Sequence, residues 1–272
     1  NDACAVIAEA LSPDGTEAGF AKLMTQRAKQ IGLKNSSFKN SNGWPANGHN
    51  MSVRDLGLLA EKLLSDFPEY YPMFAEQTYD FDGRAPANTR NRNPLLGLGI
   101  GADGLKTGHT KEAGYGLVGS AKQDGRRIIF VLSGLQSLEE RAQEAEAIVN
   151  WAFRQFVIKK FKKGGSEIGT AKVWNGSSRR VSLHIENDLN VMIPVLNSSE
   201  PSFSIEYTGP IEAPIQKGDS VAELVIRSSD LPETRHSLIA GNNVSKGGFL
   251  VKVRTAGEYL FNTLFTSSEE NL

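Results

Sequence analysis

Three consecutive residues, Lys106, Thr107 and Gly108, combine a positive charge, a hydroxyl group and an open backbone position. They directly precede two β-rich runs that predict a hairpin. The ammonium group would attract a carboxylate, and the hydroxyl would hydrogen-bond to it. Glycine, which has no side chain, would let a ligand backbone approach closely. A run of Lys-Thr-Gly often occurs by chance, and the alternative is that these three residues form a surface turn.

Other kinds of chemistry find little support in the sequence. His49, His184 and His236 are too scattered to form a metal-ligand spacing, so we expect no metal site and no cofactor. The glycine-rich run 97–101 lacks the lysine of a phosphate loop. The single cysteine, Cys4, excludes an intrachain disulfide. A formal net charge of -1 gives no basis for binding nucleic acid.

The elements that must position the motif are helices and a hairpin. Apolar residues recur at helical spacing in four segments: 2–11, 17–31, a segment between Ser52 and Pro68, and 138–156. Ser52 with Asp55 fits a capping box in which Asp replaces the usual Glu. Asp124-Gly125, between the β-rich runs 115–121 and 127–132, predicts a tight hairpin. This order predicts an α/β (α+β) domain in which helices cover a sheet.

The second half of the chain has a different pattern. Short β-rich runs separated by turn residues predict a small β-sandwich; they are 172–174, 180–185, 190–195, 203–207 and 221–226. The lysine-rich stretch 159–165 has the composition of a linker. We therefore expect an α/β domain over 1–158, a β-sandwich over 159–250, and a C-terminal segment, 251–272, that forms a possible amphipathic helix.

Four motifs occur in one order along the first half of the chain. They are Asn1-Asp2-Ala3-Cys4, Asn91-Arg92-Asn93 with Leu95-Leu96, 103–110 with Ala113-Gly114-Tyr115, and 151–156. Trp174, 197–199 and 213–217 extend the pattern into the second half. Together these motifs resemble the type-5 group of D-alanyl-D-alanine carboxypeptidases, which are low-molecular-mass, serine-type, peptidase S11-like penicillin-binding proteins. The resemblance covers nearly the whole chain.

This resemblance implies a fold and a reaction. The first domain would be β-lactamase/transpeptidase-like, with a largely antiparallel sheet between helices, and would be incomplete at its N-terminus. A serine would attack the peptide bond between two D-alanines of a peptidoglycan stem pentapeptide, and water would hydrolyse the acyl-enzyme. β-Lactam antibiotics would acylate the same serine.

The resemblance also implies site residues. Asn1 corresponds to the asparagine of a Ser-x-Asn motif, which helps to hold the substrate amide and the active-site lysine. Lys106, Thr107 and Gly108 correspond to the third motif of the family, which would lie on a strand at the edge of the sheet, beside the cleft. His109 would line the cleft or serve as a structural histidine. Arg92 matches an arginine near the carboxylate subsite, a task that suits its forked donors. The alternative for Arg92 is a surface ion pair.

The chain departs from the family in its nucleophile. The family places Ser-x-x-Lys at the start of a helix before Ser-x-Asn, whereas the only match here is Ser36-Ser37-Phe38-Lys39, in a loop-like sequence after Asn1. We interpret this match as a coincidence. The nucleophilic serine would then lie outside this chain, and the chain alone would be inactive. We expect an N-terminal segment of the same protein to be present in any well-folded sample.

Several alternatives remain open at this stage. The activity would be that of a carboxypeptidase, a serine β-lactamase or a DD-endopeptidase of the same superfamily, or the chain would be a non-catalytic module that binds wall peptides. The family implies a location in the periplasm, at the cell-wall face of the cytoplasmic membrane. The C-terminal segment would bind the membrane surface or pack on the protein, and it has few basic residues for an interfacial helix.

Overall fold

The computed structural model describes residues 1–196, 200–228, 231–249, 251 and 253. The chain divides into two compact units, an N-terminal unit, Asn1–Phe153, and a C-terminal unit, Arg154–Leu272. The sequence predicted a division a few residues later, after residue 158. Each unit has its own hydrophobic core.

The N-terminal unit contains a three-stranded antiparallel sheet in the order β3-β4-β5. Its strands are β3 (Ala102–Thr110), β4 (Gly114–Gln123) and β5 (Arg126–Leu135). Asp124 (φ 48°) and Gly125 (φ 79°) form the turn between β4 and β5, which confirms the predicted Asp-Gly hairpin. Because β3 lies at the edge of this sheet, the Lys-Thr-Gly motif occupies the kind of position that was expected for it.

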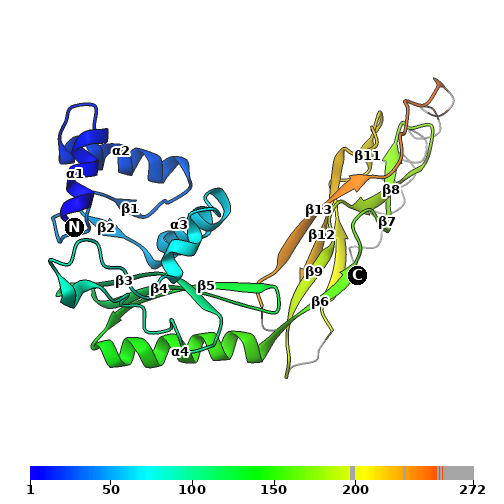
Figure 1. Ribbon diagram of the computed structural model, residues 1–272. Helices are drawn as coiled ribbons and strands as arrows, with labels where there is room; N and C mark the ends of the chain where they lie inside the picture. The colour runs from blue at the N-terminus through cyan, green and yellow to red at the C-terminus, as the bar shows by residue number, and fades with distance from the viewer. Residues whose placement is uncertain (197–199, 229–230, 250, 252, 254–272) are drawn as a thin grey trace, which may run out of the picture. The chain divides into compact units, whose positions relative to one another are not determined.

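The N-terminal unit contains four helices at the places that the apolar spacing predicted. They are α1 (Asp2–Leu11), α2 (Glu17–Gln30), α3 (Val53–Asp66) and α4 (Leu138–Gln155). Shorter elements lie between them: β1 (Ser36–Ser37), β2 (Asn50–Met51), η1 (Tyr71–Ala75) and η2 (Pro86–Asn88). α4 runs along one face of the sheet, and α3 lies on the other face (Figure 1).

The capping box predicted at the start of α3 is only half formed. The Ser52 hydroxyl accepts a hydrogen bond from the backbone N–H of Asp55 (3.1 Å), as a helix cap does. The buried Asp55 carboxylate instead accepts hydrogen bonds from the Ser36 hydroxyl (2.6 Å) and the backbone N–H of Asn35 (2.7 Å). The bond from Ser36 is the main reason that the pKa of Asp55 lies below its usual value. Asp55 therefore ties α3 to β1.

Two hydrophobic clusters hold the sheet of the N-terminal unit between its helices. One consists of the buried residues Leu95, Leu117, Ala121, Ala145 and Val149, which join β4 to α4. The other consists of Ala60, Tyr71 and Leu105, which join α3 and η1 to β3. Side chains of neighbouring β4 residues point to opposite faces, so Leu117 packs in the first cluster and Val118 against the second. The sheet is thus covered on both faces.

Within its described residues the C-terminal unit is built mainly from strands; the exceptions are the last two residues of α4 and the helical residues 249, 251 and 253. A six-stranded sheet has the order β10-β12-β13-β8-β7-β11, and a two-stranded ribbon pairs β6 with β9. The strands are β6 (Phe156–Lys162), β7 (Glu167–Trp174), β8 (Arg180–Ile185), β9 (Leu189–Pro194), β10 (Ser202–Glu206), β11 (Ile211–Glu212), β12 (Ser220–Arg227) and β13 (Thr234–Ala240). One cluster of buried side chains from both sheets forms the core, which agrees with the predicted all-β region.

The lysine-rich stretch expected to be a linker is largely a strand. Lys159, Lys160 and Lys162 lie in β6, which pairs with β9 from Phe156 to Lys162. Phe161 packs against the core. Lysines fit in this ribbon because its ladder bonds come from the backbone while their side chains remain exposed to water. The run of lysines therefore did not mark the end of regular secondary structure.

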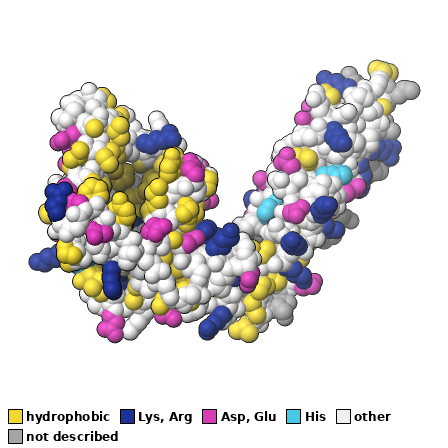
Figure 2. Space-filling model, in the orientation of Figure 1, with side chains coloured by type: hydrophobic (Ala, Val, Ile, Leu, Met, Phe, Trp, Pro, Cys, Tyr) yellow, Lys and Arg dark blue, Asp and Glu magenta, His cyan; other side chains and the backbone are white. Residues whose placement is uncertain are grey.

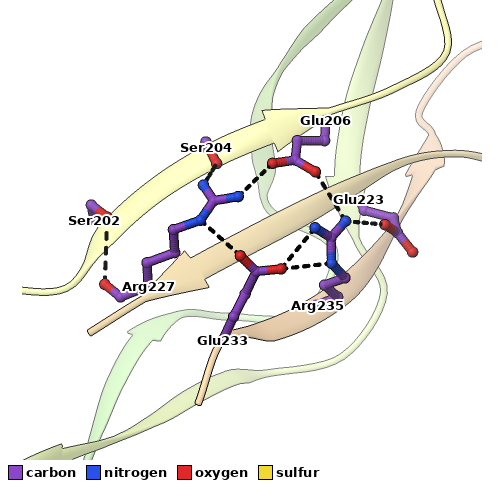
Figure 3. A network of polar contacts seen from close by, with 7 residues as sticks. All are labelled: Ser202, Ser204, Glu206, Glu223, Arg227, Glu233 and Arg235. Atoms are coloured by element: carbon purple, nitrogen blue, oxygen red, sulfur yellow. Dashed lines mark hydrogen bonds and ion pairs between the residues drawn. The ribbon is translucent and has the colours of Figure 1, made fainter. Parts of the chain in front are cut away.

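An exposed network of arginine and glutamate side chains joins β10, β12 and β13 (Figure 3). Arg227 pairs with Glu206 (2.7 Å) and Glu233 (2.7 Å). Arg235 pairs with Glu206 (2.9 Å), Glu223 (2.9 Å) and Glu233 (2.7 Å). Hydrogen bonds to these carboxylates, first of all to Glu223, hold the pKa of Arg235 above its ordinary value. We call this set the outer network; it links neighbouring strands at a surface open to water.

The predicted C-terminal helix lies outside the described residues, except for residues 251 and 253. No helix in the described part of the chain is both long enough and apolar enough to cross a membrane.

Candidate active site

β3 presents the Lys-Thr-Gly motif beside open space. Lys106 pairs with Val118 and Gly108 pairs with Gly116 in the antiparallel ladder. The Lys106 ammonium donates a hydrogen bond to the backbone carbonyl of Thr107 (2.6 Å). A side-chain carbon added to Gly108 would meet no heavy atom within 4 Å. The strand therefore leaves room at Gly108 for a ligand backbone.

A cavity of about 1140 Å³ opens at this strand. Its lining includes all six residues that the sequence assigned to the site: Asn1, Arg92, Lys106, Thr107, Gly108 and His109. They come from the first turn of α1, the loop before β3, and β3 itself. The fold thus brings together residues that are far apart in the sequence, although their individual roles stay predictions.

Asn1 is held by the backbone of α1 rather than by its own side chain. It occupies the N-cap position, its carbonyl accepts a hydrogen bond from the N–H of Ala5 (3.2 Å), and its side chain makes no capping bond. That side chain is 66% exposed. The helix therefore fixes the residue while its amide group remains available to a ligand.

Arg92 reaches the cavity from the loop that precedes β3. Its guanidinium donates a hydrogen bond to Asn88 Oδ1 (2.8 Å). The neighbouring Asn93 is buried and donates a hydrogen bond from its side chain to the Gly104 carbonyl (2.8 Å), which ties this loop to the start of β3. Within the described residues Arg92 forms no ion pair, so its charge is available to an anionic ligand.

Arg141, on α4, is a cavity residue that the sequence analysis did not identify. Its side chain is almost fully buried, with 4% of the residue exposed, and its Nε has no hydrogen-bond partner among the described residues. Nη2 donates a long hydrogen bond to the Arg92 carbonyl (3.3 Å), and the guanidinium lies 5.9 Å from the centre of the Tyr115 ring. No carboxylate of the described chain pairs with it. A buried cation without a counter-ion is costly, which points to an anion supplied from outside.

Helical spacing contained the signal for Arg141. Ala145 and Val149 lie on the apolar face predicted for this helix and are buried, and Arg141 precedes them on the same face by four and eight residues. A charged residue at a buried helical position needs an explanation. The helix starts as caps require, since Ser137 Oγ accepts a hydrogen bond from the N–H of Glu140 (3.0 Å).

The cations of the cavity affect one another. Partial burial lowers the pKa of Lys106 from its ordinary value, and the positive charges of Arg92 and Arg141 lower it further. Each cation disfavours the protonated form of its neighbour, and a bound carboxylate would relieve this repulsion. Among the residues that line the cavity, Glu112 is the one carboxylate. The electrostatics therefore favour an anionic ligand.

His109 stacks on Tyr115, its cross-strand partner, with ring centroids 3.9 Å apart and an interplanar angle of 28°. Tyr115 also faces Arg141. His109 is thus placed at the wall of the cavity by a stacking contact that a purely structural histidine would also make.

The cavity contains no evident nucleophile of its own. No serine or cysteine of the described chain lines it. The Ser-x-x-Lys match is used structurally, because Ser36 donates to Asp55 and Ser37 donates to the Gly48 carbonyl (2.6 Å). Ser36 and Ser37 form β1 and begin no helix. The described lining therefore offers groups that can bind an anion and an amide.

A second, more apolar cavity adjoins the first. It has a volume of about 640 Å³, and its lining includes Met24 of α2, Leu56 of α3, Phe38 and Trp44. Hydrophobic side chains gather around the hollow between these helices and the sheet (Figure 2). Trp44 and Leu56 line both cavities. No cluster of three or more His, Cys, Asp or Glu side chains that could hold a metal occurs in the described residues.

Comparison with known families matches both units. Residues 1–137 match the family model described as D-alanyl-D-alanine carboxypeptidase. Residues 156–246 match the model described as penicillin-binding protein 5, C-terminal domain. Among curated proteins, the D-alanyl-D-alanine carboxypeptidase DacA of Escherichia coli strain K12 is 31% identical over 277 residues. The match covers 97% of this chain and 65% of the length of DacA, so the chain spans slightly less than two thirds of this relative.

Solved structures agree with this assignment. Penicillin-binding protein 5 from Haemophilus influenzae is 30% identical, with a TM-score of 0.75, over 90% of this chain and 71% of that protein. Penicillin-binding protein D2 from Listeria monocytogenes, solved in an ampicillin-bound form, is 34% identical with a TM-score of 0.50, over 56% of this chain and 62% of that protein. With the family model matched over half of the chain and a cavity lined by the motifs that first indicated it, the chain belongs to the D-alanyl-D-alanine carboxypeptidase family.

Proposed function

We propose that this chain is the larger part of a serine-type D-alanyl-D-alanine carboxypeptidase. The observation that carries the proposal is the cavity at β3, where Lys106, Arg92 and the unpaired, buried Arg141 meet beside Thr107. Three cations at one end of a cleft suit the terminal carboxylate of a stem pentapeptide that ends in D-alanyl-D-alanine. The forked donors of arginine match the planar carboxylate group.

The reaction follows from that placement. The serine oxygen attacks the carbonyl carbon of the penultimate D-alanine while its proton passes to a neighbouring base. The peptide C–N bond then breaks, and the terminal D-alanine leaves with the proton on its amine. Water hydrolyses the resulting ester and restores the serine. Asn1, at the start of α1, would hydrogen-bond to the substrate amide, and Gly108 would let the substrate backbone lie along β3.

The serine and its partner lysine would come from a segment of the protein outside these 272 residues. A small apolar cavity of about 260 Å³, lined by Leu117, Val118 and Leu132 together with Lys106, offers that segment a place to pack beside the motif. By this proposal the chain alone forms no acyl-enzyme. The enzyme would act on peptidoglycan outside the cytoplasmic membrane and would be acylated by β-lactams.

Intact mass spectrometry under denaturing conditions tests the proposal. The complete protein should gain the mass of one benzylpenicillin, and the 272-residue chain alone should gain none. The complete protein should also release D-alanine from a stem pentapeptide. If the complete protein gains no mass and releases no D-alanine, the carboxypeptidase proposal fails and a peptide-binding module takes its place. Rapid turnover of penicillin would indicate a β-lactamase, and cleavage of cross-linked dimers a DD-endopeptidase.

A further inference from the structure

The start of β3 contains one residue more than the strand with which it pairs. Ala102 pairs with Ala121, and Gly104 pairs with Ser120, which directly precedes Ala121 in the sequence. Asp103 is therefore the extra residue of a β-bulge. Bulges of this kind commonly re-aim a neighbouring side chain, and they are frequent next to active sites.

The bulge decides which β4 residue lies opposite Lys106. One extra residue in β3 shifts the pairing of every later residue of the strand by one position along β4. Without the bulge, Lys106 would pair with Leu117, which is buried in the cluster against α4. With it, Lys106 pairs with Val118 instead. The position of the ammonium group in the cavity thus depends on whether the bulge at Asp103 is kept.

A set of four side chains from four elements holds this bulge. Arg127 of β5 donates two hydrogen bonds to the Asp103 carboxylate (2.7 and 2.6 Å) and a third to the hydroxyl of Ser120 on β4 (2.6 Å). The hydroxyl of Tyr71 on η1 donates to Asp103 (3.0 Å), and the Arg127 guanidinium lies 5.0 Å from the centre of the Tyr71 ring. We call these residues the bulge clamp.

The charged members of the bulge clamp are partly shielded from water. The side chains of Asp103 and Arg127 are 28% and 27% exposed, while Ser120 and Tyr71 are buried. Burial raises the pKa of Tyr71 to about 12, so its hydroxyl keeps its proton and remains a donor. A bidentate arginine–carboxylate pair in this setting has a fixed geometry as well as a favourable energy.

The same point of β3 also fixes the loop of Arg92. The Gly104 carbonyl accepts the hydrogen bond from the buried Asn93, which follows Arg92. A side-chain carbon on Gly104 would come within 2.5 Å of the Tyr71 hydroxyl, so the clamp closes on a position that only glycine fits. Gly104, the residue next to the bulge, therefore helps to place two cations of the cavity, Arg92 and Lys106.

We propose that Asp103 is a positioning residue for Lys106: gripped by Arg127 and Tyr71, it sets the register in which the motif strand presents its ammonium group to the carboxylate of the substrate. This role rests on the proposed carboxypeptidase function. Asp103 touches no substrate, and it acts through the bulge. Its loss would leave the fold in place and allow Lys106 to move away from Arg92 and Arg141.

The test compares Asp103→Asn and Tyr71→Phe with Glu206→Gln, all in the complete protein. Glu206 belongs to the outer network of the C-terminal unit, where it pairs with two arginines, so its variant controls for the loss of an ion pair. The readout is the rate constant of acylation by benzylpenicillin per folded molecule, measured by intact mass across the alkaline pH range. Thermal unfolding is measured in parallel.

Asp103→Asn should lower the acylation rate constant on the order of 10-fold to 100-fold, as small misplacements of a catalytic group do. Tyr71→Phe should lower it less, because Arg127 still holds the carboxylate. In Asp103→Asn the alkaline loss of acylation should also move to higher pH, since Lys106 would escape the charges that lower its pKa. Glu206→Gln should change neither quantity.

Three outcomes would overturn the inference. If Asp103→Asn lowers thermal stability but keeps the acylation rate and its pH profile, the clamp is only structural. If Glu206→Gln produces the same loss of rate, the effect belongs to ion pairs in general. If the unaltered protein is never acylated, the proposed function fails, and the positioning role fails with it.

Discussion

Each unit of the chain contains a cluster of arginines and carboxylates, and the two clusters differ in burial and in what lies next to them. In the bulge clamp, Arg127 grips one carboxylate at a strand end, and both side chains are less than a third exposed. In the outer network, Arg227 and Arg235 pair with three glutamates, two of them in common, and both arginine side chains are more than two fifths exposed. Exposed pairs contribute little to stability and are screened by salt. Arginine–carboxylate pairs can therefore fix a functional strand in the N-terminal unit and contribute little to stability at the surface of the C-terminal unit.

A second contrast lies within the N-terminal unit. Arg127 has a carboxylate partner, whereas Arg141, which is more deeply buried, has none among the described residues. Arg127, which holds the bulge, is paired with a carboxylate of the protein, whereas Arg141, which we propose binds a ligand, has no carboxylate partner among the described residues. Five substitutions or conditions test these contrasts, from the largest expected effect to the smallest.

Lys106→Ala should have the largest effect, because it removes the charge at the centre of the cavity. We expect acylation of the complete protein by benzylpenicillin to fall on the order of 10²-fold to 10³-fold. Thermal stability should change little, since Lys106 forms no ion pair within the described residues. Rates come from intact mass over time, and Lys106→Arg serves as the control that keeps a charge. Equal rates for Lys106→Ala and the unaltered protein would remove Lys106 from the mechanism.

Arg141→Met should separate function from stability. A carboxylate ligand such as N-acetyl-D-alanyl-D-alanine should bind about 10-fold more weakly, because one charge-assisted contact is lost. The free energy of unfolding should rise by roughly 1 kcal/mol, because an unpaired buried cation is replaced by an apolar side chain. Calorimetric titration and denaturant unfolding measure the two quantities. A large loss of stability would show that Arg141 serves the fold.

Gly108→Ala should weaken ligand binding in a protein that still folds. The added methyl group meets no heavy atom within 4 Å in the free protein, but it would stand where a substrate backbone approaches, at a cost of about 10-fold in affinity. Gly101→Ala is the matched control: its φ is +80° and a side chain there would collide with the Lys122 carbonyl, so it should lose stability instead. Similar behaviour of the two variants would contradict this distinction.

The pH dependence of carboxylate binding should reflect the repulsion among Lys106, Arg92 and Arg141 in the cavity. The folded pKa of Lys106 lies below its ordinary value, so Lys106 loses its proton, and the site loses affinity, at lower pH than for a free lysine. The same depression means that protonated Lys106 opposes folding. This effect is complete below the folded pKa of Lys106 and disappears as pH rises from there to the ordinary value of lysine. Arg92→Gln should move the alkaline loss of binding to higher pH. A profile that stays in place would mean that Arg92 does not act on Lys106.

Arg235→Gln should have the smallest effect. It removes three exposed ion pairs of the outer network, and we expect the unfolding midpoint to fall by about 2 °C at low salt and by less at high salt. Acylation by penicillin should not change. Differential scanning calorimetry at two salt concentrations is the measurement. A change in acylation here would break the contrast between the two clusters.

Much of this architecture was predictable from local sequence patterns. Apolar spacing located the four helices, the Asp124-Gly125 turn located the hairpin, and the motif itself indicated an edge strand. The strand β6 was taken for a linker because its lysines hid a ladder that depends on a distant partner, β9. The contact between Asp103 and Arg127 was not foreseeable, because it depends on a bulge whose existence is fixed only when two strands pair. Local sequence patterns therefore predict helices and strands, whereas the register between two strands is fixed only when the chain folds.

The position of β3 has a consequence for how copies of this protein behave in concentrated solution. Within the described residues β3 has a strand neighbour on one side only, and an open strand edge is a template on which other chains can aggregate. Lys106 near the middle of that edge, with Gly104 and Gly108 on either side, makes it a poor template, because charge and weak β-propensity both oppose pairing. The residues that would admit a peptide to the cleft therefore also act as gatekeepers against self-association, and a protein stripped of Lys106 should be the more prone to aggregate.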